Sequence, residues 1–145
     1  MVPNARGGDR EGGGQDDPGE RWAAPGGAFE VAHRRVGARS VLELSGEVDI
    51  ATVATLQEAL EHVGQGSEVV VLDLGGLSFA DSSMLAALAS ACNRLRSQGG
   101  DLRLARARGQ MRRVLELTGL VELLPPFPSV DQALAGGTGG ARPAG

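Results

Sequence analysis

The chain has 145 residues, a length at which one domain with a single buried core is expected. Its formal net charge of -4 provides no basic field for phosphate backbones, so no nucleic acid is expected as a partner. No apolar run approaches the roughly 20 residues that cross a bilayer, so no membrane is expected either. Cys92 is the single cysteine and has no partner for a disulfide within the chain, which favours a reducing cytoplasm.

Glycine and charged residues dominate both ends of the chain. Residues 1–28 offer too little apolar surface to offset the entropy of ordering, so a disordered tail is predicted there. Trp22 lies in this tail and is expected to have no structural role. Residues 136–145 are predicted to be a second tail, which leaves residues 29–135 as the folded domain.

The domain is expected to open with a β-hairpin formed by residues 29–35 and 39–46, which turns at Gly37 and Ala38. Residues 49–63 then predict a helix, because apolar side chains recur there at spacings of three, four and three. These inward positions are Val53, Leu56, Leu60 and Val63.

Residues 69–74 form a nearly continuous apolar run, which is typical of a central strand covered on both faces. A second helix is predicted over residues 82–96 and a further strand around Leu102 and Leu104. The apolar face of that helix consists of Leu85, Leu88, Cys92 and Leu95. A last helix over residues 110–118 is expected to turn Met111, Val114, Leu115 and Thr118 inward. The order indicates an α/β fold with a mixed, mostly four-stranded sheet and helices packed on it.

The segment from Phe79 to Leu85 joins the central strand to the second helix. In one interpretation Asp81 is only an N-cap, since Asp and Ser accept hydrogen bonds from the free N–H groups of a first helical turn. The position of this segment favours a functional role, because open α/β sheets place functional groups at the carboxyl ends of their strands.

This segment and its surroundings resemble the STAS family of anti-sigma factor antagonists. Residues 44–49 resemble the family's Gly-Glu-(Leu/Val)-Asp entry into its first helix, and residues 70–83 resemble its central strand and phosphoacceptor turn. Residues 98–120 resemble its final third. The matches follow in the right order over nearly all of the expected domain and imply a STAS-type fold, an opening hairpin followed by βαβαβα.

The resemblance implies that Ser82 is the phosphorylated residue, with Ser83 as the second choice and Asp81 as the organiser of the loop. Met84 stands where the family usually has Gly, so its side chain is expected to alter or block docking of the partner. The partner-binding positions that the resemblance implies are Glu47, Asp49, Asp81, Ser82, Ser83 and Met84.

The implied function is that of an anti-sigma factor antagonist. The unphosphorylated chain would bind an anti-sigma factor that is a serine kinase, release a sigma factor, and lose this activity on phosphorylation. The kinase would supply ATP and Mg, so no cofactor is expected in this chain, and a PP2C-type phosphatase is expected to remove the phosphate. The alternative is a STAS accessory module of a transporter, for example in lipid trafficking, that acts as a constitutive structural partner.

Other chemistry has less support in the sequence. A hydrolase would need a base beside Ser82, but only His33 and His62 are present and no Gly-x-Ser-x-Gly elbow exists, so the chain is not expected to be an enzyme. One cysteine and no histidine pair at ligand spacing argue against a metal site. A local basic stretch is interpreted as a solvated helix face and loop rather than a phosphate site. It comprises Arg103, Arg106, Arg108, Arg112 and Arg113.

Overall fold

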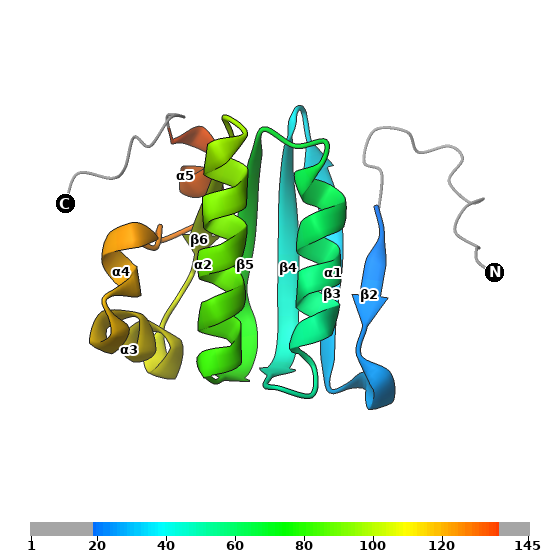
Figure 1. Ribbon diagram of the computed structural model, residues 1–145, viewed down its shortest axis with the longest axis vertical. Helices are drawn as coiled ribbons and strands as arrows, with labels where there is room; N and C mark the ends of the chain where they lie inside the picture. The colour runs from blue at the N-terminus through cyan, green and yellow to red at the C-terminus, as the bar shows by residue number, and fades with distance from the viewer. Residues whose placement is uncertain (1–18, 137–145) are drawn as a thin grey trace.

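A computed structural model describes residues 19–136. It contains a five-stranded sheet in the order β2-β3-β4-β5-β6, one strand more than expected (Figure 1). The strands are β2 (Arg21–Ala23), β3 (Phe29–Val36), β4 (Arg39–Val48), β5 (Val69–Ala80) and β6 (Asp101–Ala105). The first three pair antiparallel, whereas β4, β5 and β6 run parallel. The predicted mixed α/β sheet is therefore confirmed.

Two helices, α1 (Val53–Gly64) and α2 (Ser82–Ser97), lie side by side on one face of the sheet (Figure 1). All four inward positions expected of α1 are buried, and α2 buries Leu88, Cys92 and Leu95 while Leu85 is half-buried. Burial raises the pKa of the Cys92 thiol, which keeps it protonated at neutral pH. Among residues 19–136 no helix is long and apolar enough to cross a membrane.

Beyond β6 the chain forms α3 (Gly109–Thr118), α4 (Leu120–Leu123) and α5 (Val130–Ala135). Met111 and Leu115 of α3 are buried as expected. The inward position expected for Thr118 is wrong, because its side chain is exposed and its hydroxyl donates to the Val114 carbonyl at 2.8 Å. The same hydroxyl lies 3.3 Å from the Leu115 carbonyl, so it bonds back to the last turn of its own helix instead of packing into the core.

Strand β5 is central and covered on both faces, as its apolar run predicts. Val70 and Leu72 pack with the α1 and α2 side of the core, whereas Val69 and Val71 pack on the other face. The cover on that second face comes from Ala133 of α5 and the half-buried side chains around it. The sequence did not indicate this helix, which has only six residues.

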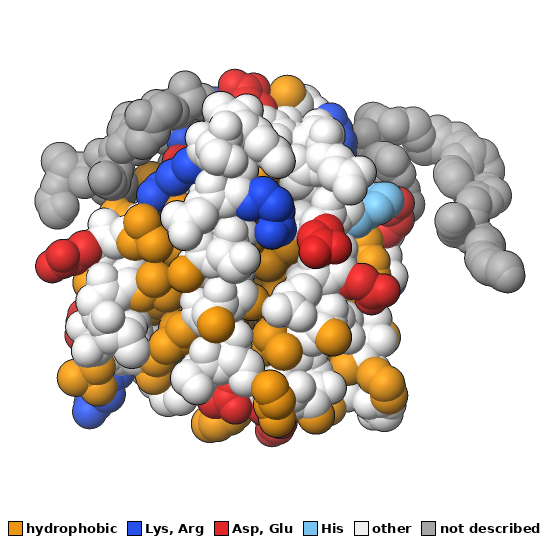
Figure 2. Space-filling view, viewed as in Figure 1, with side chains coloured by type: hydrophobic (Ala, Val, Ile, Leu, Met, Phe, Trp, Pro, Cys, Tyr) orange, Lys and Arg blue, Asp and Glu red, His pale blue; other side chains and the backbone are white. Residues whose placement is uncertain are grey.

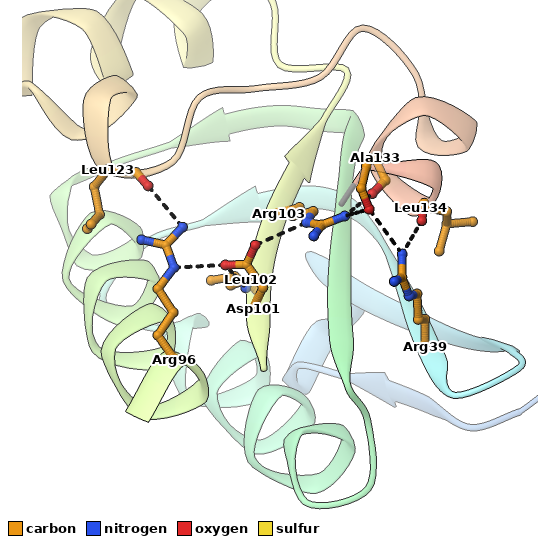
Figure 3. Close-up of polar contacts among 9 residues, drawn as sticks. Arg39, Arg96, Asp101, Leu102, Arg103, Leu123, Ala133 and Leu134 are labelled. Atoms are coloured by element: carbon orange, nitrogen blue, oxygen red, sulfur yellow. Dashed lines mark hydrogen bonds and ion pairs between the residues drawn. The ribbon is translucent and has the colours of Figure 1, made fainter. Parts of the chain in front are cut away.

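Arginine side chains attach the C-terminal segment to the sheet (Figure 3). The carboxylate of Asp101 accepts from Arg96 at 2.8 Å and from Arg103 at 3.1 Å, and both Asp101 and Arg103 are buried. These two arginines, together with Arg39, donate to the main-chain carbonyls of Leu123, Ala133, Leu134 and Gly136. Because a buried charge needs partners, this set of contacts specifies where the segment docks.

The tail predicted over residues 1–28 is wrong for the part that the structure describes. Trp22 lies in β2 opposite Val31 of β3 and is half-buried against the core. Its ring centroid is 6.4 Å from that of His33 and 5.6 Å from that of His62. A three-residue strand with one aromatic side chain is too short to register as a periodic pattern. Residues 1–18 and 137–145 lie outside the described residues, so the remaining tail predictions rest on sequence alone.

We predict that Leu72→Ala destabilises the fold by roughly 2 to 5 kcal/mol. Leu72 pairs with Leu42 of β4 and Leu104 of β6, and all three side chains are fully buried. Leu117→Ala is the matched control, because Leu117 is 79% exposed and should lose less than about 0.5 kcal/mol. Urea unfolding measures both, and equal losses would contradict the central position of Leu72.

We also predict that Trp22→Ala lowers the free energy of unfolding by roughly 1 to 3 kcal/mol, less than a fully buried ring would cost because Trp22 is half-buried. Trp22→Phe should retain most of the stability, since it keeps an aromatic ring in the same place. Calorimetric melting compares the two variants. An unchanged melting temperature for Trp22→Ala would mean that β2 contributes nothing to the domain.

Candidate functional site

A single residue, Asp81, separates the last residue of β5 from the first residue of α2. Its backbone N–H donates to the carbonyl of Val48, the last residue of β4, at 3.1 Å. The turn is therefore tied to the neighbouring strand. The strand expected to end at Leu74 continues for six more residues, so what looked like a connecting loop in the sequence is largely β-structure.

Asp81 also caps α2. Its side-chain Oδ1 accepts from the N–H of Ser83 at 2.8 Å, and its own backbone is extended, with φ -114° and ψ -168°. This satisfies one of the free N–H groups of the first helical turn. The structural interpretation of Asp81 as an N-cap is correct.

The two serines of the turn differ in exposure. Ser82 is exposed, whereas Ser83 is half-buried with its N–H bonded to Asp81. Ser82 is thus the more accessible of the two serines. The physical difference between them follows from the helix, which turns successive residues about 100° apart.

Met84 does not lie where the sequence analysis expected. Its side chain is fully buried in the core under α2. The prediction that this side chain contacts a partner is therefore wrong, because a buried side chain cannot make that contact. The reason is helical geometry: Met84 lies three and four residues before Ala87 and Leu88, which face the sheet.

The end of β4 and the turn that follows it place two acidic residues, Glu47 and Asp49, at the same edge of the sheet. Oδ1 of Asp49 accepts from the N–H groups of Ala51 and Thr52 at 2.9 and 3.1 Å. The hydroxyl of Thr52 donates to the carbonyl of Glu47 at 2.9 Å. These bonds form a rigid turn, and they explain why α1 begins at Val53 rather than at Asp49.

Glu47, Asp49, Asp81 and Ser82 share this edge because β4 and β5 run parallel and end together. We call the surface formed by Glu47, Asp49, Ile50, Phe79, Asp81 and Ser82 the Ser82 edge. Figure 2 shows acidic and hydrophobic side chains gathered at the bottom of the view, where α1 and α2 begin. Of the predicted partner-binding residues, all but Met84 lie at or beside this surface.

Three residues near this edge had no role predicted from the sequence. Ile50 is 80% exposed and Phe79 is 43% exposed, although both are apolar. The Gln110 side chain of α3 donates from Nε2 to the carbonyl of Ala80 at 3.1 Å, which connects α3 to the end of β5. No sequence signal marked the exposure of Ile50 and Phe79, because exposure of an apolar side chain depends on tertiary packing.

The arginines of the predicted basic stretch, in and after β6, do not form one basic surface. Arg103 is buried, which corrects the expectation of a solvated position. Arg106 donates to both carboxylate oxygens of Asp73, at 2.8 and 3.1 Å, and this hydrogen bonding raises the pKa of its guanidinium. Arg112 pairs with Glu116 one turn further along α3 at 3.3 Å. Several of these charges are thus engaged within the domain.

Neither histidine is positioned to act on Ser82. His33 is buried between Ser40 and Glu20, with ring nitrogens 2.9 and 3.3 Å from their oxygens. His62 lies near the C-terminal end of α1, a helix roughly 18 Å long that begins at the Ser82 edge. Within residues 19–136 no three His, Cys, Asp or Glu side chains gather as metal ligands.

The chain belongs to the STAS domain family, whose model matches residues 31–133. It is 33% identical over 107 residues to the candidate anti-anti-sigma factor Rv2638 of Mycobacterium tuberculosis, with 72% of each chain covered. The crystal structure of an anti-sigma factor antagonist from Mycobacterium paratuberculosis superposes with a TM-score of 0.68 at 32% identity, covering 77% of this chain and 95% of that one.

The fold is also that of the anti-sigma factor antagonist SpoIIAA in its unphosphorylated form, with a TM-score of 0.63 at 20% identity. That alignment covers 72% of this chain and 92% of the other. The STAS fold expected from the sequence is thereby confirmed.

We predict that Asp81→Ala lowers the stability of the domain by about 0.5 to 2 kcal/mol, because α2 loses its N-cap. Asp81→Asn is the matched control: asparagine caps about as well, so most of the stability should remain. Guanidinium unfolding measures both variants. If Asp81→Ala and Asp81→Asn unfold alike, the cap does not contribute to stability.

Proposed function

We propose that this chain is an anti-sigma factor antagonist that is switched off by phosphorylation of Ser82. Unphosphorylated, it binds an anti-sigma factor that is also a serine kinase, so that the sigma factor is released. The observation that carries the proposal is the exposed side chain of Ser82 at the first position of α2, beside the acidic residues of the Ser82 edge.

Ser82 is a better acceptor than Ser83 for a steric reason. A kinase must bring the serine hydroxyl in line with the γ-phosphate of ATP, which requires free access. The exposed Ser82 meets this requirement in the folded domain better than the half-buried Ser83 does. The kinase carries the ATP and Mg, and this chain supplies only the hydroxyl.

The fold should tolerate the phosphate. A phosphoserine adds about -1.5 to -2 charges, and a helix N-terminus stabilises negative charge by roughly 0.3 to 1 kcal/mol. Ser82 is the first residue of α2, so the added charge lies at the favourable end of this helix. The modified domain is therefore expected to remain folded.

The interface with the partner, in contrast, should not tolerate the phosphate. The carboxylate of Asp81 is adjacent, and Glu47 and Asp49 lie at the same edge, so a partner would have to desolvate a dianion among like charges. A loss of about 3 kcal/mol already lowers the affinity on the order of 100-fold. A PP2C-type phosphatase would restore binding by removing the phosphate.

The names of the relatives support this proposal: one is a candidate anti-anti-sigma factor, and two solved neighbours are anti-sigma factor antagonists. The transporter-module alternative depended on Met84 standing at the docking surface in place of Gly. Its buried side chain removes that argument. We place the proposed activity in the cytoplasm, where sigma factors act.

We predict that Ser82→Ala and Ser82→Asp differ in partner binding while both stay folded. The alanine variant adds no charge, so it should bind the anti-sigma factor as the wild type does and resist phosphorylation. The aspartate variant carries one negative charge and should bind at least roughly tenfold more weakly, about 1.4 kcal/mol. The partner is first captured from native cytosol and identified as an ATP-binding protein, then purified for titration calorimetry.

Ser83→Ala is the control for position and should keep both binding and phosphorylation. Mass spectrometry after incubation of the pair with ATP and Mg locates the phosphate. Phosphate on Ser83 alone, or equal affinities of the alanine and aspartate variants, would refute the switch. Capture of a transporter subunit in place of an ATP-binding regulator would favour the alternative.

A further inference from the structure

Large apolar side chains are exposed at four positions among residues 19–136, and two of them belong to the Ser82 edge. The four are Val36, Ile50, Phe79 and Leu117. Exposed apolar residues that occur singly are ordinary, but a pair beside a functional group indicates an interaction site.

Ile50 projects from a turn that is already rigid. Asp49 and Thr52 hold the backbone on either side of it through three hydrogen bonds of 2.9 to 3.1 Å. Its side chain is 80% exposed, so it contributes little to the core of the free domain. A backbone held in place before binding loses little conformational freedom on binding.

Phe79 contributes a second apolar surface at the same edge. It lies opposite Glu47 in the β4–β5 register and is the residue before the last of β5. It borders an open groove of about 380 Å³ between the end of β5 and the start of α3. Leu77 and Met111 also line this groove, so an apolar side chain of a partner finds apolar neighbours there.

The charges around Ile50 are acidic, whereas the exposed Arg108 lines the groove beside Phe79. Glu47, Asp49 and Asp81 are the ionisable residues of the Ser82 edge, and all three are acidic. The arginines that form ion pairs in the described part of the chain use other carboxylates, those of Glu43, Asp73, Asp101 and Glu116. A complementary protein would therefore carry positive charge where it faces the acidic residues around Ile50, beside an apolar centre.

We propose that Ile50 and Phe79 are the apolar anchors through which the chain binds its protein partner. The partner offers an apolar hollow, with arginine or lysine side chains on the side that faces Glu47, Asp49 and Asp81. This inference rests on the proposed function, because the partner is taken to be the anti-sigma factor. It adds that affinity comes from burying Ile50 and Phe79, while Ser82 controls whether that burial is allowed. Interfaces commonly depend on a few such central residues.

The test compares Ile50→Ser with Leu117→Ser, since Leu117 is 79% exposed and lies on α3, outside the Ser82 edge. Titration calorimetry uses the purified ATP-binding anti-sigma factor described above. Ile50→Ser is expected to weaken binding at least roughly tenfold, about 1.4 kcal/mol, and Leu117→Ser to change it less than about twofold. Phe79→Ser should resemble Ile50→Ser, with thermal melting confirming that each variant is folded.

The outcomes separate the two proposals. If the anti-sigma factor binds the wild type and Ile50→Ser equally, the anchor inference is overturned while the proposed function stands. If Leu117→Ser weakens binding as much as Ile50→Ser, the interface is not confined to the Ser82 edge and the inference is also wrong. If the wild type binds no anti-sigma factor, the proposed function fails and the anchor inference fails with it.

Discussion

The hydrogen bond from the Asp81 N–H to the Val48 carbonyl is the interaction on which the site depends. It joins the ends of two parallel strands at the point where one of them becomes a helix. Parallel strands end at the same edge of a sheet, so this bond aligns the β4–α1 turn with the start of α2. The acidic turn, the capping aspartate and the exposed serine are brought together by this alignment.

This arrangement explains how a charge can act on binding without acting on the fold. A phosphate on Ser82 would sit at a helix start, where the main chain favours negative charge. In solution the phosphate and the nearby carboxylates are separated by water and screened by salt. Against a partner the water leaves, and the same charges repel at low dielectric. The free energy of the proposed switch would thus be expressed in the complex rather than in the isolated domain.

Periodicity predicted most of the fold and part of the site. The inward face of α1 and the central position of β5 follow from apolar spacing, which depends only on local geometry. The burial of Met84 was not predicted, because the family pattern has Gly there and said nothing about a larger side chain. The packing of Trp22 and the helix α5 were not predicted, since β2 and α5 are both too short to show a repeating pattern. The exposure of Ile50 is a tertiary property with no local signature.

The contacts at the two ends of the described chain determine how the domain can be attached to a support or to a second protein. Glu20 contacts His62 near the end of α1, and Gly136 accepts from Arg103, a residue of β6. Both ends therefore leave the domain away from the edge where α1 and α2 begin (Figure 1). A surface linker, fluorescent protein or affinity support joined at either end would leave the Ser82 edge facing solution.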